Sequence, residues 1–316
     1  MPTIKQEVTE QYAIYNADCI ELTREIPDES IGLSIFSPPF ASLYTYSNSS
    51  RDMGNCKTDD EFMENFGFLV DELYRITQAG RIVAFHCMNL PASKERDGYI
   101  GIKDFRGDLI RCFQKRGFIY HSEHVIWKDP LVAATRTKAL GLLHKQLCKD
   151  SAMCRAGIPD YLIAMRKPGE NPVPISHVNG LETFYGENPP TEGVLSHQRW
   201  QRYASPVWMD IDPSYTLQAE SLRNDKDERH VCPLQIQVIE RALELWSKKG
   251  DTVLSPFMGI GSETVTAVKM GRNAIGIELK EEYYDQAARN MKKAVEDTHK
   301  QMTFDFGGNE SKGSEK

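Results

Sequence analysis

Residues 251–278 read DTVLSPFMGIGSETVTAVKMGRNAIGIE, and this stretch decides the fold. Its first residues, 251–254, predict a short strand, and a turn with two glycines follows directly. The next residues predict a helix, and 273–279 predict a second strand. A strand, a glycine turn, a helix and a second strand in this order are typical of a parallel α/β sheet that binds a ligand at the first turn.

The glycine turn has the chemistry of a cofactor site. Gly259 and Gly261 let a ligand approach the backbone, and the helix that follows offers free N–H groups. Glu278, at the end of the second strand, can accept hydrogen bonds from ribose hydroxyls. The third glycine of the dinucleotide fingerprint is replaced by Thr264, which disfavours NAD or FAD. The pattern favours a cofactor that contains a nucleoside, although a simple packing turn also uses glycines.

Strands and helices continue to alternate on the N-terminal side of this stretch. We expect Gly80 to end the first helix, and residues 168–226 to be loop-rich because they carry many prolines and turn residues. The alternation predicts an α/β fold with a mostly parallel, doubly wound sheet. The expected strands are 31–36, 81–88, 118–127 and 161–165, and the expected helices are 59–78, 104–116, 234–246 and 281–296.

A second motif, Ser37-Pro38-Pro39-Phe40, follows the expected strand at 31–36. The Ser37 hydroxyl and the Pro38 carbonyl oxygen can both accept hydrogen bonds from one amino group. Two such acceptors draw the nitrogen lone pair out of conjugation, and the lone pair can then attack a methyl sulfonium. Phe40 offers a face on which a planar base can stack, and the rigid prolines suit a reaction that depends on orientation. The same four residues can also simply end a strand.

Together the two motifs resemble those of the amino-methylating DNA methyltransferases, which act on adenine N6 or cytosine N4. That family has a [D/N/S]PP[Y/F/W] tetrapeptide and an FxGxG loop, matched here by SPPF at 37–40 and FMGIG at 257–261. The tetrapeptide comes first, as in the circularly permuted β group, and orphan enzymes of phages and prophages are similar over residues 12–296. The resemblance implies a Rossmann-like, S-adenosylmethionine-dependent fold, with a catalytic half at 1–167, a target-recognition insertion at 168–226, a cofactor-binding half at 227–299 and a flexible tail at 300–316.

The resemblance also implies roles for individual residues. Ser37 and the carbonyl of Pro38 would hold the target amino group, Pro39 would keep the turn rigid, and Phe40 would stack on a base flipped out of the duplex. For Asp18 and His230, helix capping remains open as an alternative role. The residues expected to contact S-adenosylmethionine are Asp18, His230, Ser255, Pro256, Phe257, Gly259, Gly261, Ser262 and Glu278.

Charge is distributed unevenly along a chain whose formal net charge is −7. Residues 1–72 hold 4 Lys and Arg against 14 Asp and Glu, a net of −10, whereas residues 94–155 hold 13 against 7, a net of +6. The basic stretch can attract phosphates, although charge runs are also common on solvated faces. The candidate DNA contacts are Tyr44, Arg136, Lys138, Lys145, Arg199 and Arg202.

Other features restrict the cellular setting and the chemistry. The seven cysteines include no CxxC pair and no zinc-type spacing, which predicts a reducing compartment and no metal site. The chain has no apolar run of 18 residues and no signal-peptide pattern, so we expect a cytoplasmic protein of a bacterial or phage-infected cell that does not contact a membrane. No Pro-Cys pair is present for C5-cytosine methylation, and protein glutamine methyltransferases have their cofactor loop first.

Several alternatives stay open within this reading. The serine that begins the tetrapeptide favours cytosine N4 over adenine N6 as the target, but Phe36 stands where N4-cytosine enzymes usually have Thr. Ser255 stands where the family usually has Asp. The substrate is expected to be double-stranded DNA, with RNA as an alternative, and a DNA-binding regulator without catalysis remains a second class. A homodimer, and a sliding-clamp contact through residues 301–306, are further possibilities.

Overall fold

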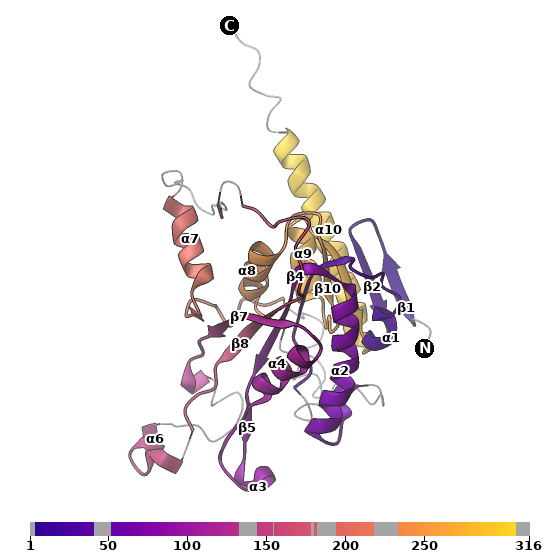
Figure 1. The fold of residues 1–316 in the computed structure, drawn as a ribbon. Helices are drawn as coiled ribbons and strands as arrows, with labels where there is room; N and C mark the ends of the chain where they lie inside the picture. Colours follow the sequence, from indigo (N-terminus) through magenta and orange to yellow (C-terminus); the bar gives the residue numbers. More distant parts are fainter. Residues whose placement is uncertain are drawn as a thin grey trace.

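The computed structural model describes residues 4–40, 52–132, 144–153, 155–177, 180–181, 194–217 and 233–307. Within these residues the chain forms a nine-stranded sheet with helices on both faces (Figure 1). This three-layer arrangement agrees with the Rossmann-like, doubly wound α/β fold that the sequence predicts.

The sheet is mixed but mostly parallel, in the order β1-β2-β11-β10-β3-β4-β8-β7-β9. The five central strands, β2, β11, β10, β3 and β4, all run parallel, and so do β7 and β9. The antiparallel pairs are β1 with β2, and β8 with both β4 and β7. The strands are β1 (Lys5–Val8), β2 (Tyr12–Asn16), β3 (Ile31–Phe36), β4 (Thr77–Met88), β7 (Ile119–Ile126), β8 (Asp160–Arg166), β9 (Val207–Trp208), β10 (Thr252–Ser255) and β11 (Asn273–Glu278).

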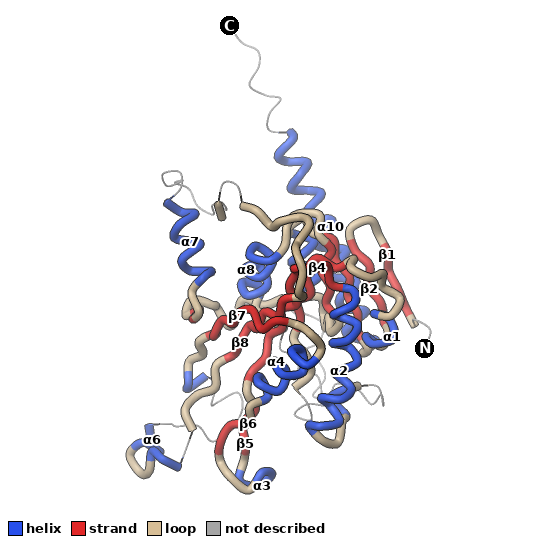
Figure 2. The backbone as a smooth tube through the Cα atoms, in the orientation of Figure 1, coloured by secondary structure: helices blue, strands red, loops and turns tan. Residues whose placement is uncertain are grey.

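Most of the helices lie on one face of the sheet or the other (Figure 2). A small hairpin, β5 (Leu90–Ala92) and β6 (Gly101–Lys103), extends from the end of β4 and carries the short helix α3 (Lys94–Asp97). The other helices are α1 (Cys19–Thr23), α2 (Asp59–Ile76), α4 (Phe105–Lys115), α6 (His144–Leu147), α7 (Val194–Ala204), α8 (Ile236–Trp246), α9 (Ser262–Lys269) and α10 (Glu281–Gly307), with 3-10 turns at Met53–Asn55 and Ser151–Met153.

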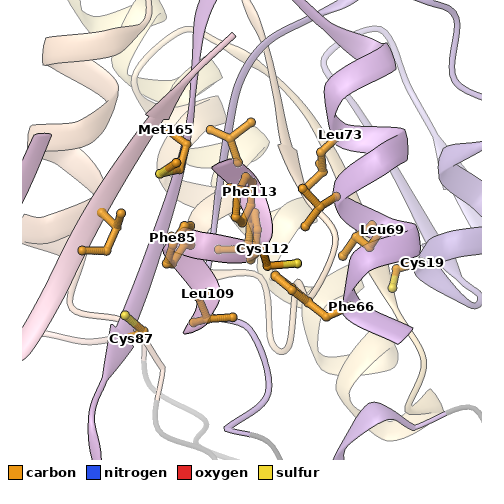
Figure 3. Packing of buried hydrophobic residues seen from close by; sticks show 14 of the residues in the cluster. Cys19, Phe66, Leu69, Leu73, Phe85, Cys87, Leu109, Cys112, Phe113 and Met165 are labelled. Atoms are coloured by element: carbon orange, nitrogen blue, oxygen red, sulfur yellow. The ribbon is translucent and has the colours of Figure 1, made fainter. Parts of the chain in front are cut away.

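Helices α1, α2 and α4 cover one face of the sheet. In α2, the Thr58 hydroxyl caps the helix by accepting a hydrogen bond from the backbone N–H of Glu61, and the buried residues recur at helical spacing. Phe66 of α2 packs edge-on against Phe113 of α4, which stacks on Phe85 of β4 at 5.0 Å between ring centroids (Figure 3). Burial of each such side chain contributes about 1.5–3 kcal/mol, so this aromatic core holds the three elements in a fixed relation.

Helices α8, α9 and α10 cover the opposite face. Val238 and Ile239 of α8 and Met291 of α10 are completely buried, in one cluster with Leu33 and Ile35 of β3. A buried ion pair links β4, β3 and the residue before β10. The Arg81 guanidinium contacts Asp251 and donates from Nε to the Gly32 carbonyl oxygen at 2.8 Å. The two halves of the sequence therefore share one sheet.

Two expectations about local structure need correction. Gly80 does not end a helix: α2 stops at Ile76, and Gly80 lies inside β4 with a φ of +72°. A Cβ there would meet the Asn171 backbone nitrogen at 2.7 Å, so the glycine allows the backbone of the turn after β8 to approach β4 closely. The last helix continues to Gly307, beyond the expected end at residue 296, and so crosses the proposed boundary of the tail at residue 300.

The segment 168–226, which the sequence predicts to be a loop-rich insertion, contributes one strand and one helix to the described fold. Its residues Val207–Trp208 form β9, which pairs with β7 at the edge of the sheet, and the Trp208 side chain is buried. Its helix α7 is joined to α8 by an ion pair between Arg199 and Glu244. No described helix is both long and apolar enough to cross a membrane.

Candidate active site

The two motifs end adjacent strands at one edge of the sheet. The tetrapeptide follows β3 and the glycine turn follows β10, and these strands are parallel neighbours with Leu254 opposite Ser34. Glu278 ends β11, which is parallel to β10 on its other side. The carboxyl ends of β2, β11, β10, β3 and β4 therefore lie together, and we call this the carboxyl edge. The sequence motifs, about 220 residues apart in the chain, meet there.

Direct contact confirms that the two turns are neighbours. The ring of Phe36, the last residue of β3, lies 5.8 Å from the ring of Phe257 in the glycine turn, centroid to centroid. Phe36 is fully buried, whereas Phe257 keeps part of its surface exposed. This aromatic pair sets the distance between the backbone that carries Ser37 and the backbone that carries the glycines.

The glycine turn is shaped to accept a ligand. Gly259 and Gly261 have φ values of +56° and +95°, which side-chain-bearing residues rarely adopt. Among the residues that the structure describes, no atom lies within 4 Å of a Cβ built on Gly259, so this face of the turn has room for a ligand. Gly261 is the N-cap residue of α9, whose first N–H groups can face an anionic or polar group.

Glu278 holds the glycine turn and adds a carboxylate to it. One carboxylate oxygen accepts from the Gly259 N–H and the other from the Lys280 N–H, both at 2.8 Å. Although the residue keeps some exposed surface, burial of its carboxylate raises the pKa to about 7. Glu263, in the first turn of α9, is buried and its pKa is raised to about 8, with burial as the main cause and Glu278 adding to it.

The remaining predicted cofactor residues lie around this turn. Asp18 follows β2 at the same edge, and its carboxylate caps α1 by accepting from the N–H groups of Ile20 and Glu21. Ser255 is fully buried at the end of β10, and within the described part of the chain its hydroxyl has no hydrogen-bond partner. Pro256 and Ser262 are buried on either side of the turn. His230 lies outside the described residues.

The tetrapeptide presents one hydroxyl and one aromatic ring. Ser37 is partly exposed, and its Oγ lies 3.2 Å from Nδ1 of His86. Phe40 is half-buried and its ring lies 6.4 Å from that of Phe105, at the start of α4. Pro38 is buried and packs against the protein, whereas Pro39 is partly exposed.

The predicted DNA contacts fall into four groups. Lys145 is exposed on α6, in the connection between β7 and β8, which leaves β7 and enters β8 at the carboxyl edge. Arg202 is exposed but pairs with Asp210 at 2.6 Å. Arg199 is largely buried and pairs with Glu244 at 2.6 Å, so its charge serves the packing of α7 on α8. Tyr44, Arg136 and Lys138 lie outside the described residues.

Sequence reasoning missed His86, which contacts Ser37, and two residues that are linked to it in turn. They are His86, near the end of β4, Asp160, the first residue of β8, and Lys128, which follows β7. The available signal was position: the expected strand at 81–88 places His86 at the same edge as the tetrapeptide. Asp160 could not be found in this way, because it begins an antiparallel strand and so reaches the carboxyl edge from the other direction.

Comparison with known proteins agrees with this geometry. The family model for N6- and N4-directed enzymes, described as DNA methylase, matches residues 31–289. The chain belongs to this DNA methylase family. It is similar to the type II methyltransferase M1.MboII of Moraxella bovis, with 41% identity over 289 residues that cover 87% of this chain and 94% of the relative. An orphan methyltransferase of Bacillus amyloliquefaciens, M.BamHII, is 25% identical and covers 89% of this chain and 96% of its own length.

Solved structures show the same fold. The cytosine-N4-specific PvuII DNA methyltransferase superposes with a TM-score of 0.64 at 16% identity, covering 94% of this chain and 95% of that one. A putative DNA modification methylase from Thermus thermophilus, complexed with S-adenosylmethionine, gives a TM-score of 0.60 at 20% identity, covering 90% and 96%. The DNA methylase described here is thus an S-adenosylmethionine-dependent amino-methyltransferase.

Proposed function

We propose that this DNA methylase transfers a methyl group to N4 of a cytosine flipped out of double-stranded DNA at a specific site. The observation that carries the proposal is the placement of the Ser37 hydroxyl and the glycine turn on adjacent parallel strands, joined by the Phe36–Phe257 contact. A serine leads the tetrapeptide, and the PvuII enzyme with the same fold is cytosine-N4-specific. Adenine N6 is the competing target.

The residues at the glycine turn fit S-adenosylmethionine. The open face of Gly259 gives room for the backbone to be approached, and Glu278 supplies the carboxylate expected to bind the ribose. Asp18, at the end of β2, would lie toward the adenine, and Phe257 would line the path between the turns. When bound, the cofactor supplies a methyl group on a positively charged sulfur, which is a strong electrophile.

The tetrapeptide would hold the nucleophile. A flipped base would stack on Phe40, which Phe105 supports from behind, and its amino group would donate to the Ser37 hydroxyl and the Pro38 carbonyl oxygen. Donation to two acceptors leaves the nitrogen lone pair free to point at the methyl group. The contribution of these residues is orientation, because no covalent enzyme intermediate is needed.

The basic connection between β7 and β8 would bind the DNA backbone. Lys145 on α6 is exposed there, and Arg136 and Lys138 belong to the same connection, outside the described residues. Contacts of this kind position the duplex without reading its sequence. The role of residues 168–226 in target recognition stays a prediction, as do the homodimer and the clamp contact; in residues 301–306 only the helical backbone is described.

Nucleoside analysis tests the target base. DNA from cells that express the full chain would be digested and separated by mass spectrometry, beside DNA from cells that express Ser37→Ala. We expect N4-methylcytosine in the first sample and none in the second. N6-methyladenine instead would overturn the cytosine assignment, and tight S-adenosylmethionine binding without any methylated base in DNA would favour the non-catalytic regulator.

A further inference from the structure

Behind Ser37, three side chains from separate elements form a chain of polar contacts. His86 Nδ1 lies 3.2 Å from Ser37 Oγ, and His86 Nε2 lies 3.2 Å from an oxygen of Asp160. The other oxygen of Asp160 lies 2.5 Å from Lys128 Nζ. These contacts join β3, β4, β8 and the residues after β7 at the carboxyl edge.

The pairing of the strands explains why these residues meet. Leu162 of β8 is opposite His86 of β4, and alternate residues of a strand share one face of the sheet. Asp160 is two residues from Leu162 and therefore lies on the face of His86. Ile126 is opposite Asp160, and Lys128 follows two residues later, where its ammonium group reaches the carboxylate. The hydrogen-bonded register of the sheet holds the chain of contacts in place.

Because His86 and Asp160 are buried, the charge on each residue in this row of contacts depends on its neighbours. The side chain of Asp160 is only 4% exposed and that of His86 only 11%, so neither can rely on water as a partner. Burial alone would raise the pKa of Asp160, but His86 and Lys128 outweigh burial and lower it. Asp160 is thus a carboxylate, which can only accept hydrogen bonds.

We propose that His86, oriented by Asp160 and Lys128, is a positioning residue that keeps Ser37 an acceptor for the target amino group and receives the proton which that group releases. The proposal rests on the role of Ser37 in the proposed function. A carboxylate beside Nε2 selects the tautomer with its proton on Nε2, which leaves Nδ1 as an acceptor. The Ser37 hydroxyl then donates to Nδ1, and its lone pairs face the substrate.

Lys128 has a distinct part in this arrangement. Its positive charge offsets the negative charge of the Asp160 carboxylate, which would otherwise be costly to bury. A protonated His86 would donate from Nδ1 to Ser37 Oγ and compete for the lone pair that the substrate needs. Lys128 lies on the far side of Asp160 from His86 and offsets the charge of the carboxylate there.

The proton balance of the reaction gives His86 its second role. As the N–C bond forms, the C–S bond of the sulfonium breaks and sulfur keeps the electron pair. The amino nitrogen is then cationic and releases one proton to Ser37 Oγ while the hydroxyl proton of Ser37 moves to His86 Nδ1. His86 becomes an imidazolium beside Asp160, and the proton passes to water when the product leaves.

Single-turnover methylation of unmethylated DNA tests this role in the full-length protein. We expect His86→Ala to slow methyl transfer about 100-fold, which is typical of a lost proton acceptor, while the Kd values for S-adenosylmethionine and DNA stay unchanged. His86→Asn places an amide oxygen where Nδ1 was, so it can accept from Ser37 but cannot take a proton; we expect about a tenfold loss. Equal rates for wild type and His86→Ala would overturn the proposal.

A double-substitution cycle separates positioning from packing. If His86 acts through Ser37, then Ser37→Ala together with His86→Ala should be no slower than Ser37→Ala alone. If the two single losses in rate multiply in the double variant, His86 acts independently of Ser37, and the proposed role of His86 through Ser37 is refuted. A wild type that methylates adenine instead of cytosine would overturn the base assignment but leave this cycle fully interpretable.

Nitrogen-15 NMR of the imidazole rings tests the tautomer without cofactor or DNA. The His86 signals are assigned by their loss in His86→Gln. We expect a protonated Nε2 and an unprotonated Nδ1 in the free protein, with the Nδ1 signal shifted by Ser37→Ala and the Nε2 signal shifted by Asp160→Asn. A ring protonated on Nδ1 in the free protein would contradict the proposal, whatever the protein methylates.

Discussion

The two sides of the carboxyl edge differ in the groups that form them. On the side of β10 and β11, backbone groups make the site: the positive-φ glycines leave an open face, and Glu278 is fixed by two N–H groups. On the side of β4 and β8, the site is made by side chains from distant parts of the polypeptide. Ser37 contacts His86, and His86 contacts Asp160. Substitutions at the glycine turn should therefore affect cofactor binding. Substitutions on several different strands should affect the rate of methyl transfer.

Removal of the Ser37 hydroxyl should give the largest effect and separate the two sides most clearly. We expect Ser37→Ala to lower the rate of methyl transfer about 100-fold or more, because one acceptor for the target amino group is lost. The Kd for S-adenosylmethionine, measured by calorimetry, should change less than about twofold. Ser30→Ala, just before β3, is the matched control and should keep the wild-type rate; a Ser37→Ala enzyme as fast as wild type would remove Ser37 from the mechanism.

The cofactor side should show its own pH dependence. Because the pKa of Glu278 is about 7, its carboxylate becomes protonated as the pH falls from 8 to 6 and loses acceptors for ribose hydroxyls. We expect the wild-type affinity for S-adenosylmethionine to fall over this range. Glu278→Gln should bind about tenfold more weakly at pH 8 and show little dependence on pH. A wild-type Kd that is constant from pH 6 to 8 would contradict this role.

Two basic residues distinguish DNA binding from packing. Lys145→Ala should weaken DNA binding several-fold and reduce the salt dependence of the binding constant by about one counterion, with an unchanged Tm. Arg199→Ala should do the reverse, because it leaves the largely buried Glu244 without its ion-pair partner and so lowers the Tm. If both substitutions altered the salt dependence equally, the assignment of Arg199 to packing would fail.

The smallest effect concerns stability near the glycine turn. The pKa of Glu263 is about 8 in the folded chain, above its ordinary value of 4.5, so the neutral form is favoured by the fold. The stabilisation is complete below about pH 4.5 and is lost as the pH rises toward 8. Glu263→Gln stays neutral, so its Tm should exceed that of wild type by about 4 °C at pH 8.5 and by little at pH 5. A difference in Tm that is independent of pH would contradict this.

Local patterns were sufficient to predict the glycine turn between β10 and α9 and most of the fold. The expected helix at 104–116 and strand at 118–127 correspond to α4 (Phe105–Lys115) and β7 (Ile119–Ile126), because each carries its own periodicity. The prediction for Gly80 was wrong, because the sequence does not distinguish a glycine that ends a helix from a glycine in a strand that another backbone segment approaches closely. Helix α7 and the two-residue β9 were missed, because long-range pairing rather than local pattern stabilises them.

The sequence by itself determined the chemistry of this protein: two short motifs, their order, and therefore the class of reaction. The tertiary structure decided which side chains stand behind the reacting serine. His86 and Asp160 are 74 residues apart in sequence, and only the antiparallel register of β4 and β8 places them 3.2 Å from each other. A motif can be read locally because its geometry is set by neighbouring residues, whereas a contact between strands depends on a register that the whole sheet must fix.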